Sequence, residues 1–144
     1  MDSVGEGYLY MPLAWYPHMG TADAAVWTRY INANPNAFER VWYDVKVGSG
    51  PDFSTVVDPA TGADVSALYK RKIDVIGLDA GKYTIIEVKP RADTRALGQV
   101  KGYKTLALRD LPGIGNPKML VVCESILPDV LFIAKGEGVE LAIV

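Results

Sequence analysis

Two carboxylates and a lysine stand in a stretch that otherwise reads as a β-hairpin, KIDVIGLDAGKYTIIEVK at residues 72–89. Asp74 lies within the first apolar segment, and Glu87 and Lys89 lie two positions apart in the second. Strand interiors disfavour Asp, Glu and Lys, so these three residues require a compensating interaction. Because side chains alternate between faces along a strand, Glu87 and Lys89 point the same way and share one site.

The geometry of the turn decides what these residues can do. A two-residue turn at Ala80 and Gly81 places Asp74 directly opposite Glu87, with Cβ atoms about 4.5 to 5.5 Å apart, whereas an odd-numbered loop breaks this register unless a bulge restores it. Opposed carboxylates repel unless a cation lies between them or one keeps its proton. Because both carboxylates offer only oxygen ligands, the cation that suits this position is Mg²⁺ or Mn²⁺.

The same arrangement gives Lys89 a chemical role. An ammonium group beside such an ion can position or activate a water nucleophile and offset the charge that develops on a phosphodiester. The alternative is a solvated strand face, in which Glu87 and Lys89 form cross-strand ion pairs with Lys72 and Asp74 and no metal is needed.

The chain has 144 residues, 49% of them hydrophobic, and a net charge of -2, which predicts one domain over residues 1–144 with its own core.

Charge is unevenly distributed along the chain. Residues 70–104 carry nine Lys or Arg against four acids, and the rest of the chain carries six against thirteen. A basic region inside an acidic protein suits a polyanion, although a solvated helix face remains the alternative.

Apolar periodicity and turn residues predict a mixed α/β fold with elements in the order α β β β α β α β. The expected elements are a helix over 21–31 with Thr21 as N-cap, strands over 40–48, 68–78 and 82–90, a helix over 92–111, a strand over 118–124, a short helix beginning at 128 and ending at Gly136 or Gly138, and a strand over 139–144. Asp93 or Thr94 is expected to cap the second helix, and Pro90 to end the strand before it.

With these elements in order, the residues resemble the PD-(D/E)XK nuclease superfamily over about residues 21 to 124. The resemblance rests on Asp74, a gap of twelve residues, and Glu87-Val88-Lys89 at the end of an apolar strand. Gln99 and Tyr103 in GQVKGY resemble the Q-xxx-Y element of the exonuclease-like branch. It implies a restriction-endonuclease-like core, in which a central mixed sheet is flanked by helices.

The resemblance also implies site roles. Asp74, Glu87 and the backbone carbonyl of Val88 would be ligands to Mg²⁺ or Mn²⁺, and Lys89 would act on the attacking water. Gln99 would support the catalytic site, and Tyr103 would contact the nucleic-acid backbone. Basic residues in the strand that carries Asp74, and on or beside the helix that follows Lys89, are expected to bind DNA phosphates: Lys72, Arg91, Arg95, Lys101 and Lys104.

Three assignments stay open. No proline precedes Asp74, and a literal Pro51-Asp52 makes Asp52 the alternative metal aspartate. The acidic residue that relatives carry on the first helix would be Asp23 or Glu39. His18, the single histidine, falls in an expected loop and receives no role.

We therefore predict a metal-dependent deoxyribonuclease that hydrolyses phosphodiester bonds with a Mg²⁺-activated water. The alternative is a nuclease-fold protein without turnover that serves as a structural or assembly module, for example in a phage particle or DNA-processing complex. The residues do not separate endo- from exonuclease action or single- from double-stranded DNA. They leave open a homo-oligomer or a partner protein. With no membrane or secretion signal, a cytoplasmic location is expected, or a virion if a phage encodes the protein.

Overall fold

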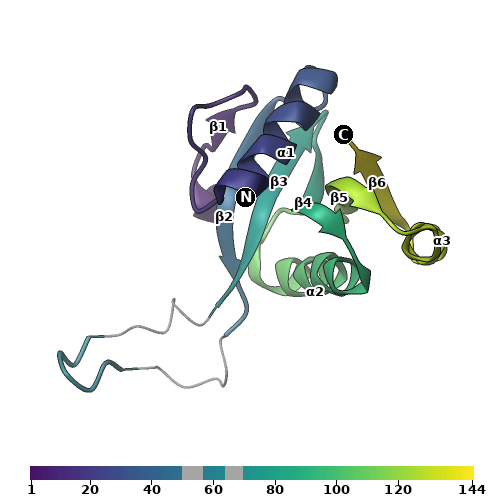
Figure 1. Ribbon diagram of the computed structural model, residues 1–144. Helices are drawn as coiled ribbons and strands as arrows, with labels where there is room; N and C mark the ends of the chain where they lie inside the picture. Colours follow the sequence, from purple (N-terminus) through teal and green to yellow (C-terminus); the bar gives the residue numbers. More distant parts are fainter. Residues whose placement is uncertain (50–56, 64–69) are drawn as a thin grey trace.

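A six-stranded mixed sheet forms the centre of the molecule, with helices on both faces (Figure 1). The computed structural model describes residues 1–49, 57–63 and 70–144. The strands lie in the order of the sequence, β1 to β6; neighbours from β1 to β4 are antiparallel, and β4, β5 and β6 are parallel. The elements are η1 (Asp2–Val4), β1 (Tyr8–Leu9), α1 (Thr21–Ala33), β2 (Arg40–Val47), β3 (Arg71–Asp79), β4 (Lys82–Ala92), α2 (Thr94–Asp110), β5 (Lys118–Ile126), α3 (Pro128–Gly136) and β6 (Val139–Ile143).

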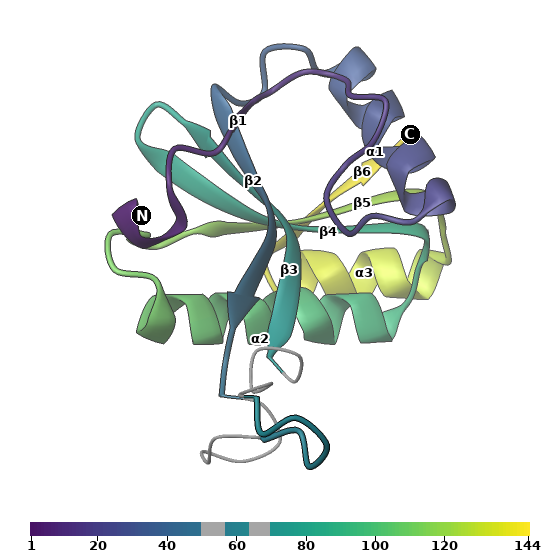
Figure 2. The same cartoon turned by 90° about the vertical axis from the view of Figure 1, so that its left-hand side faces the viewer.

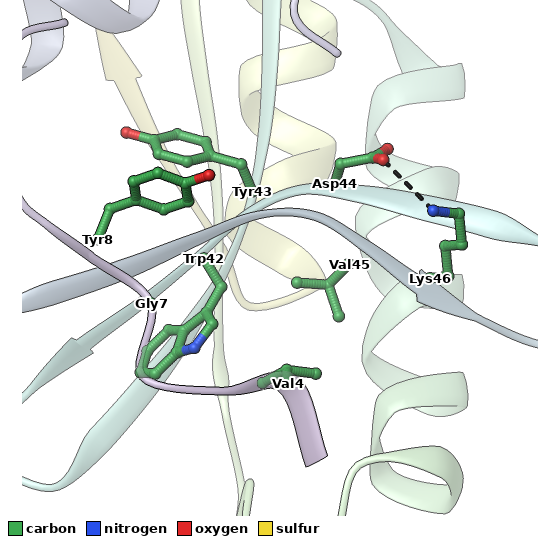
Figure 3. Close-up of a pocket in the computed structure, with 8 residues that line it drawn as sticks. All are labelled: Val4, Gly7, Tyr8, Trp42, Tyr43, Asp44, Val45 and Lys46. Carbon is green, nitrogen blue, oxygen red and sulfur yellow. Dashed lines mark ion pairs between the residues drawn. The ribbon is translucent and has the colours of Figure 1, made fainter. Parts of the chain in front are cut away.

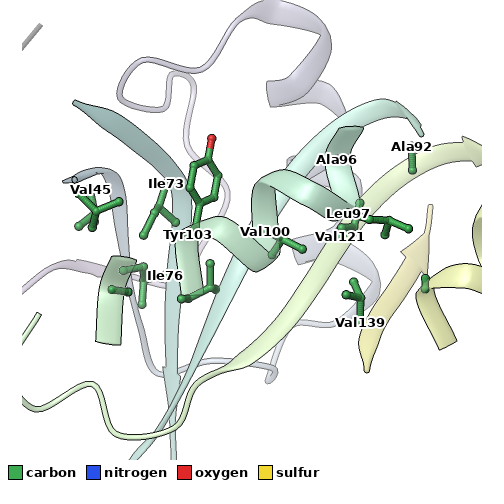
Figure 4. Close-up of a cluster of buried hydrophobic side chains, with 14 of the residues drawn as sticks. Val45, Ile73, Ile76, Ala92, Ala96, Leu97, Val100, Tyr103, Val121 and Val139 are labelled. Carbon is green, nitrogen blue, oxygen red and sulfur yellow. The ribbon is translucent and has the colours of Figure 1, made fainter. Parts of the chain in front are cut away.

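The two faces of the sheet carry separate hydrophobic clusters. Helices α2 and α3 cover one face and α1 covers the other (Figure 2). On the α2 face, Leu97 and Val100 of α2 form one cluster with Ile76 and Val121 of the sheet (Figure 4). On the α1 face, the fully buried Trp27 donates a hydrogen bond from Nε1 to the Tyr43 hydroxyl at 3.0 Å, which ties α1 to β2. Both faces of the central strands are therefore buried, as their near-continuous apolar sequences require.

The predicted elements and their order are confirmed, with β1 and the short 3₁₀ helix η1 added before α1. The prediction of Asp93 as the cap of α2 is also correct, since its side chain accepts a hydrogen bond from the Ala96 amide. The prediction of Thr21 as the N-cap of α1 is wrong: Gly20 occupies the N-cap position with no side-chain hydrogen bond, and Thr21 is already helical. Among the described residues, no helix has the length and hydropathy to cross a membrane.

Pro90 does not end its strand, which was a second wrong prediction. Strand β4 continues through Pro90 to Ala92, pairing with β5 at Lys89 and again at Arg91. The ladder between β4 and β3 stops at Ile86, so β4 has no β3 partner in register at position 90. A proline, which lacks an N–H, is tolerated where a strand has an unpaired side.

The hairpin between β3 and β4 has the predicted two-residue turn. Ala80 and Gly81 both have positive φ, 49° and 76°, the combination that matches the twist of the flanking strands. The register runs from Asp79 opposite Lys82 to Val75 opposite Ile86. Continued by one residue it would set Asp74 against Glu87, and at this point the two strands separate.

Asp44 and Asp74 mark the place where β2 and β3 change the face that they present. In β2, Tyr43 belongs to the α1 cluster, whereas Val45 belongs to the α2 cluster. In β3, Val75 belongs to the α1 cluster, whereas Ile73 belongs to the α2 cluster. Strict alternation would keep positions two apart on one face, so both strands twist locally at their aspartates. Asp44 has a φ of 53°, a conformation that aspartate tolerates better than most residues.

Gly77 provides a test of the packing in the middle of β3. A Cβ built on Gly77 would lie 2.5 Å from the Phe38 ring, so Gly77→Ala should lower the free energy of unfolding by about 1 to 3 kcal/mol. Urea denaturation measures this loss. Gly98→Ala on α2 is the matched control, because a Cβ there meets nothing within 4 Å and alanine favours the helix by about 0.5 to 1 kcal/mol. Equal effects of the two changes would contradict the packing described.

Candidate functional site

The site lies at the fork where β3 and β4 separate. The Val88 amide, which would otherwise donate across the sheet, donates instead to Asp74 Oδ2 at 2.9 Å. This bond fixes the Asp74 carboxylate beside the segment that carries Glu87, Val88 and Lys89. The fork therefore gathers the three side chains that the sequence singled out, which come from two adjacent strands.

Glu87 is the least exposed charged residue of this group, at 3% of its surface. Its Oε1 lies 3.8 Å from Lys89 Nζ, and its Oε2 is buried without a hydrogen-bond partner among the described residues. A buried carboxylate oxygen without a donor is costly and calls for an explanation. The ion pair with Lys89 compensates Oε1, and a proton shared with the neighbouring Asp74 carboxyl is the other compensation open to Glu87.

Burial and mutual repulsion raise the pKa of both carboxyl groups. For Glu87, burial is the largest cause and the nearby Asp74 the next, and together they raise its pKa to about 8. For Asp74, burial raises the pKa to about 6 in spite of the stabilising hydrogen bond from Val88. Near neutral pH the pair therefore retains a proton unless a cation replaces it.

Asp23 is the acidic residue of α1 that approaches the fork. Burial raises its pKa, the Lys89 ammonium lowers it, and its own charge raises the pKa of both Asp74 and Glu87. Glu39, the other candidate, lies at the far end of the hairpin, where its Oε1 accepts a hydrogen bond from the Ala80 amide at 3.1 Å. Asp52, the alternative metal aspartate, lies outside the described residues.

Helix α2 contributes Tyr103 and Gln99 to the neighbourhood of the fork. Burial, the largest cause, and the nearby Glu87 and Asp74 carboxylates raise the pKa of the Tyr103 phenol to about 12, although Arg71 acts to lower it. Figure 4 shows the Tyr103 ring beside Ile73 with its hydroxyl directed out of the apolar cluster. Gln99, one helical turn earlier, has a buried Oε1 that no described group donates to.

The expected DNA-binding cations do not form one surface. Arg91 and Arg95 are exposed near the start of α2, and Lys72 is half-buried on β3 opposite Lys46. Lys101 faces away from the fork, since its Nζ lies 3.1 Å from Glu137 Oε1 at the end of α3. Lys104 follows one turn later on the same side of α2. The structure therefore separates Lys101 and Lys104 from the carboxylates.

Sequence reasoning missed a polar pair beside Asp74. His18 Nε2 lies 3.2 Å from Asp44 Oδ2, and Lys46 Nζ lies 3.6 Å from the same oxygen (Figure 3 shows the second pair). The Asp44 side chain is only 8% exposed. Together with Asp74, His18 and Asp44 line a cavity of about 10 Å³, close to the space needed by one water molecule. An aspartate inside an apolar strand, the signal used for Asp74, would also have identified Asp44.

The donor set fits a hard divalent cation. Mg²⁺ and Mn²⁺ prefer oxygen donors, and the fork offers three groups of this type. They are the carboxylates of Asp74 and Glu87, both with raised pKa values, and the carbonyl of Val88. Within the described residues, no three His, Cys, Asp or Glu side chains converge as a closed metal cage. A magnesium site typically has one or two carboxylates and takes its remaining ligands from water and substrate, so this does not conflict with the donor set.

Comparison with known proteins identifies the fold. No family model matches the chain, and no curated protein sequence matches it. A repair endonuclease from Pyrococcus abyssi is 21% identical with a TM-score of 0.50, over 91% of this chain and 49% of that one. An EndoMS–dsDNA complex is 20% identical with a TM-score of 0.50, over 92% of this chain and 48% of that one. The chain thus spans about half the length of these proteins and shares a nuclease-like mixed α/β fold with them.

The buried pair makes stability depend on pH when no metal is added. Because the pKa of Glu87 is raised from 4.5 to about 8, its contribution to stability is present at acidic pH and is lost as the pH rises toward and past 8. In EDTA, we expect the free energy of unfolding to fall by about 4 kcal/mol between pH 5 and pH 9. Glu87→Gln, which cannot ionise, should remove most of this fall and be the more stable protein at pH 9.

Urea denaturation at the two pH values measures the effect. Glu140→Gln is the matched control, because Glu140 is an exposed carboxylate on the outer strand β6. It should retain the pH dependence of the unmodified chain. A Glu87→Gln protein with an unchanged pH dependence would show that Glu87 is not the buried acid described here.

Proposed function

We propose that this chain is a metal-dependent nuclease that hydrolyses phosphodiester bonds in DNA. The observation that carries the proposal is the fork itself, where the buried Glu87 carboxyl interacts with both the Asp74 carboxyl and the Lys89 ammonium, and where no N–H of the described residues donates to its Oε2. A carboxylate pair that holds a proton in place of a cation is costly to stability. Such a cost is typical of a site selected for chemistry.

Asp74, Glu87 and the Val88 carbonyl would hold Mg²⁺ or Mn²⁺. The ion, when bound, would supply Lewis-acid polarisation of the phosphate and a lower pKa for the attacking water. The contribution of the chain is to orient the ligands. The Val88 amide holds one Asp74 oxygen in place, and the burial of Glu87 keeps bulk water from competing for its carboxylate.

Lys89 would hold the nucleophile. Its side chain is 28% exposed, and its Nζ lies 3.8 Å from Glu87 Oε1. At that position it can orient a water for attack on phosphorus and offset the negative charge of the transition state. Asp23, which interacts electrostatically with Lys89 and with both carboxylates, would be the acidic contribution of α1.

Helix α2 would contribute side chains that contact the substrate or the metal ligands. The Tyr103 hydroxyl and the Gln99 amide lie on the side of α2 that faces the fork, and they would contact the phosphate backbone or order the carboxylates. Arg91, Arg95 and Lys72 would add charge near the scissile phosphate. This role of Gln99 and Tyr103 agrees with the Q-xxx-Y element that the sequence resembles.

DNA is the proposed substrate for two reasons. Phosphodiester cleavage is the reaction that the donor set and Lys89 suit, and solved structures with a similar fold include a repair endonuclease and a complex with double-stranded DNA. Because those proteins are about twice as long as this chain, their partners and lesion preferences are not carried over.

Cleavage assays with supercoiled plasmid and linear single-stranded DNA test the proposal, each with Mg²⁺, Mn²⁺ or EDTA. We expect cleavage with either metal and none with EDTA. Asp74→Asn and Lys89→Ala should each reduce the rate by about 10² to 10⁴-fold, as expected when a ligand or a group acting on the nucleophile is lost. Nicking of the plasmid would indicate internal cleavage, and its resistance would indicate a requirement for ends.

The controls match each change in charge at a distant exposed position. Asp129→Asn on α3 and Lys118→Ala at the start of β5 should cleave as the unmodified protein does. If no DNA is cleaved under any condition, or if the Asp74 and Lys89 variants remain as active as the controls, the catalytic proposal is wrong. The fold would then serve as a structural or assembly module.

A further inference from the structure

Three hollows have residues of β2 in their lining, and the first of them also borders the fork at Asp74. The first is the 10 Å³ cavity that His18, Asp44 and Asp74 line. The second, about 480 Å³, extends from Asp44 to Lys46 and includes Tyr8 and Trp42 (Figure 3). The third, about 580 Å³, extends from Lys46 to Lys70 and Arg109. Asp44 is common to the first two and Lys46 to the last two, so each hollow shares a residue of β2 with the next.

The third hollow is positively charged. Lys46, Lys70 and Arg109 are exposed and line the third hollow, which we call the β2 groove, together with Gly48, Ser49 and Asp110. Asp110 is the one acidic residue among the described residues that line it. Its carboxylate is already occupied, accepting from the Gly48 amide at 2.7 Å and from Arg109 Nε at 2.6 Å. Arg109 and Lys46 each pair with a carboxylate, Asp110 and Asp44, but the three cations that line the groove outnumber its one acid, so the groove has a net positive charge.

The positive charge of the β2 groove lies close to the fork along β2. Lys46 follows Asp44 by two residues on the same strand, so it stands about 6 to 7 Å further along β2. A phosphodiester chain whose reacting phosphate lay at Asp74 and Glu87 could enter the groove directly. Lys101 and Lys104, by contrast, lie toward α3, where Lys101 Nζ is 3.1 Å from Glu137 Oε1.

We propose that the β2 groove binds the nucleic-acid backbone on one side of the scissile phosphate, with Lys46, Lys70 and Arg109 as phosphate contacts. This inference rests on the proposed function, since it assigns the path of the substrate past the same site. It assigns phosphate binding to residues that the resemblance does not include. The contacts are with phosphate and carry no base preference.

Fluorescence anisotropy with a labelled DNA duplex in EDTA tests the path without cleavage. Lys70→Gln combined with Arg109→Gln should weaken binding about tenfold at low salt and reduce the slope of log affinity against log salt by about 2, one unit for each lost phosphate contact. Lys101→Gln combined with Lys104→Gln removes the same charge from the other side of α2 and should change neither quantity by more than about twofold.

Lys70→Arg combined with Arg109→Lys keeps the charge and should bind as the unmodified protein does, which separates a loss of charge from a loss of folding. The inference is overturned if the neutral β2 groove variant binds normally, or if the Lys101 and Lys104 variant loses as much affinity. Because the assay contains no metal, failure of the catalytic proposal would leave this result interpretable. A chain that never cleaves could still bind DNA through the β2 groove.

Discussion

The interruption of the ladder between β3 and β4 is the constraint on which the site depends. Beyond Val75 and Ile86 the strands stop pairing, and the Asp74 carboxylate takes the Val88 amide in place of a strand carbonyl. A continued ladder would place the two carboxylates on a regular, closed sheet with no room for a third group. The fork instead buries both beside Lys89, which raises their pKa values and leaves one Glu87 oxygen free.

The rest of the sheet supports this fork from both sides. Strand β2 twists at Asp44 where β3 twists at Asp74, so a second aspartate and His18 come to lie beside the first. Strand β4 continues past the fork because β5 pairs with it up to Ala92, which keeps Glu87 and Lys89 on a rigid element. Helix α2 then closes one face with Tyr103, and α1 brings Asp23 from the other.

Local signals in the sequence were sufficient for the order of the elements from α1 to β6 and for the turn that brings Asp74 and Glu87 together. The Ala80-Gly81 turn sets the register of Asp74 and Glu87, and alternation along β4 puts Glu87 and Lys89 on one face. The remainder depended on tertiary pairing. Pro90 stays within β4 only because β3 has already diverged, and the proximity of Asp44 to Asp74 follows from the register of two strands 30 positions apart in the chain. The choice of Asp23 over Glu39 likewise depended on how α1 packs.

The central claim is that the fork exchanges a retained proton for a divalent cation. Titration calorimetry of Mn²⁺ at neutral pH tests it most directly, in two buffers of different ionisation enthalpy, for the unmodified chain and for Glu87→Gln. The account predicts that the unmodified chain binds Mn²⁺ and releases protons on binding, because the pKa of Glu87 is raised to about 8, and that Glu87→Gln loses this binding. Absence of binding to the unmodified chain, or equal binding to both proteins, would contradict it.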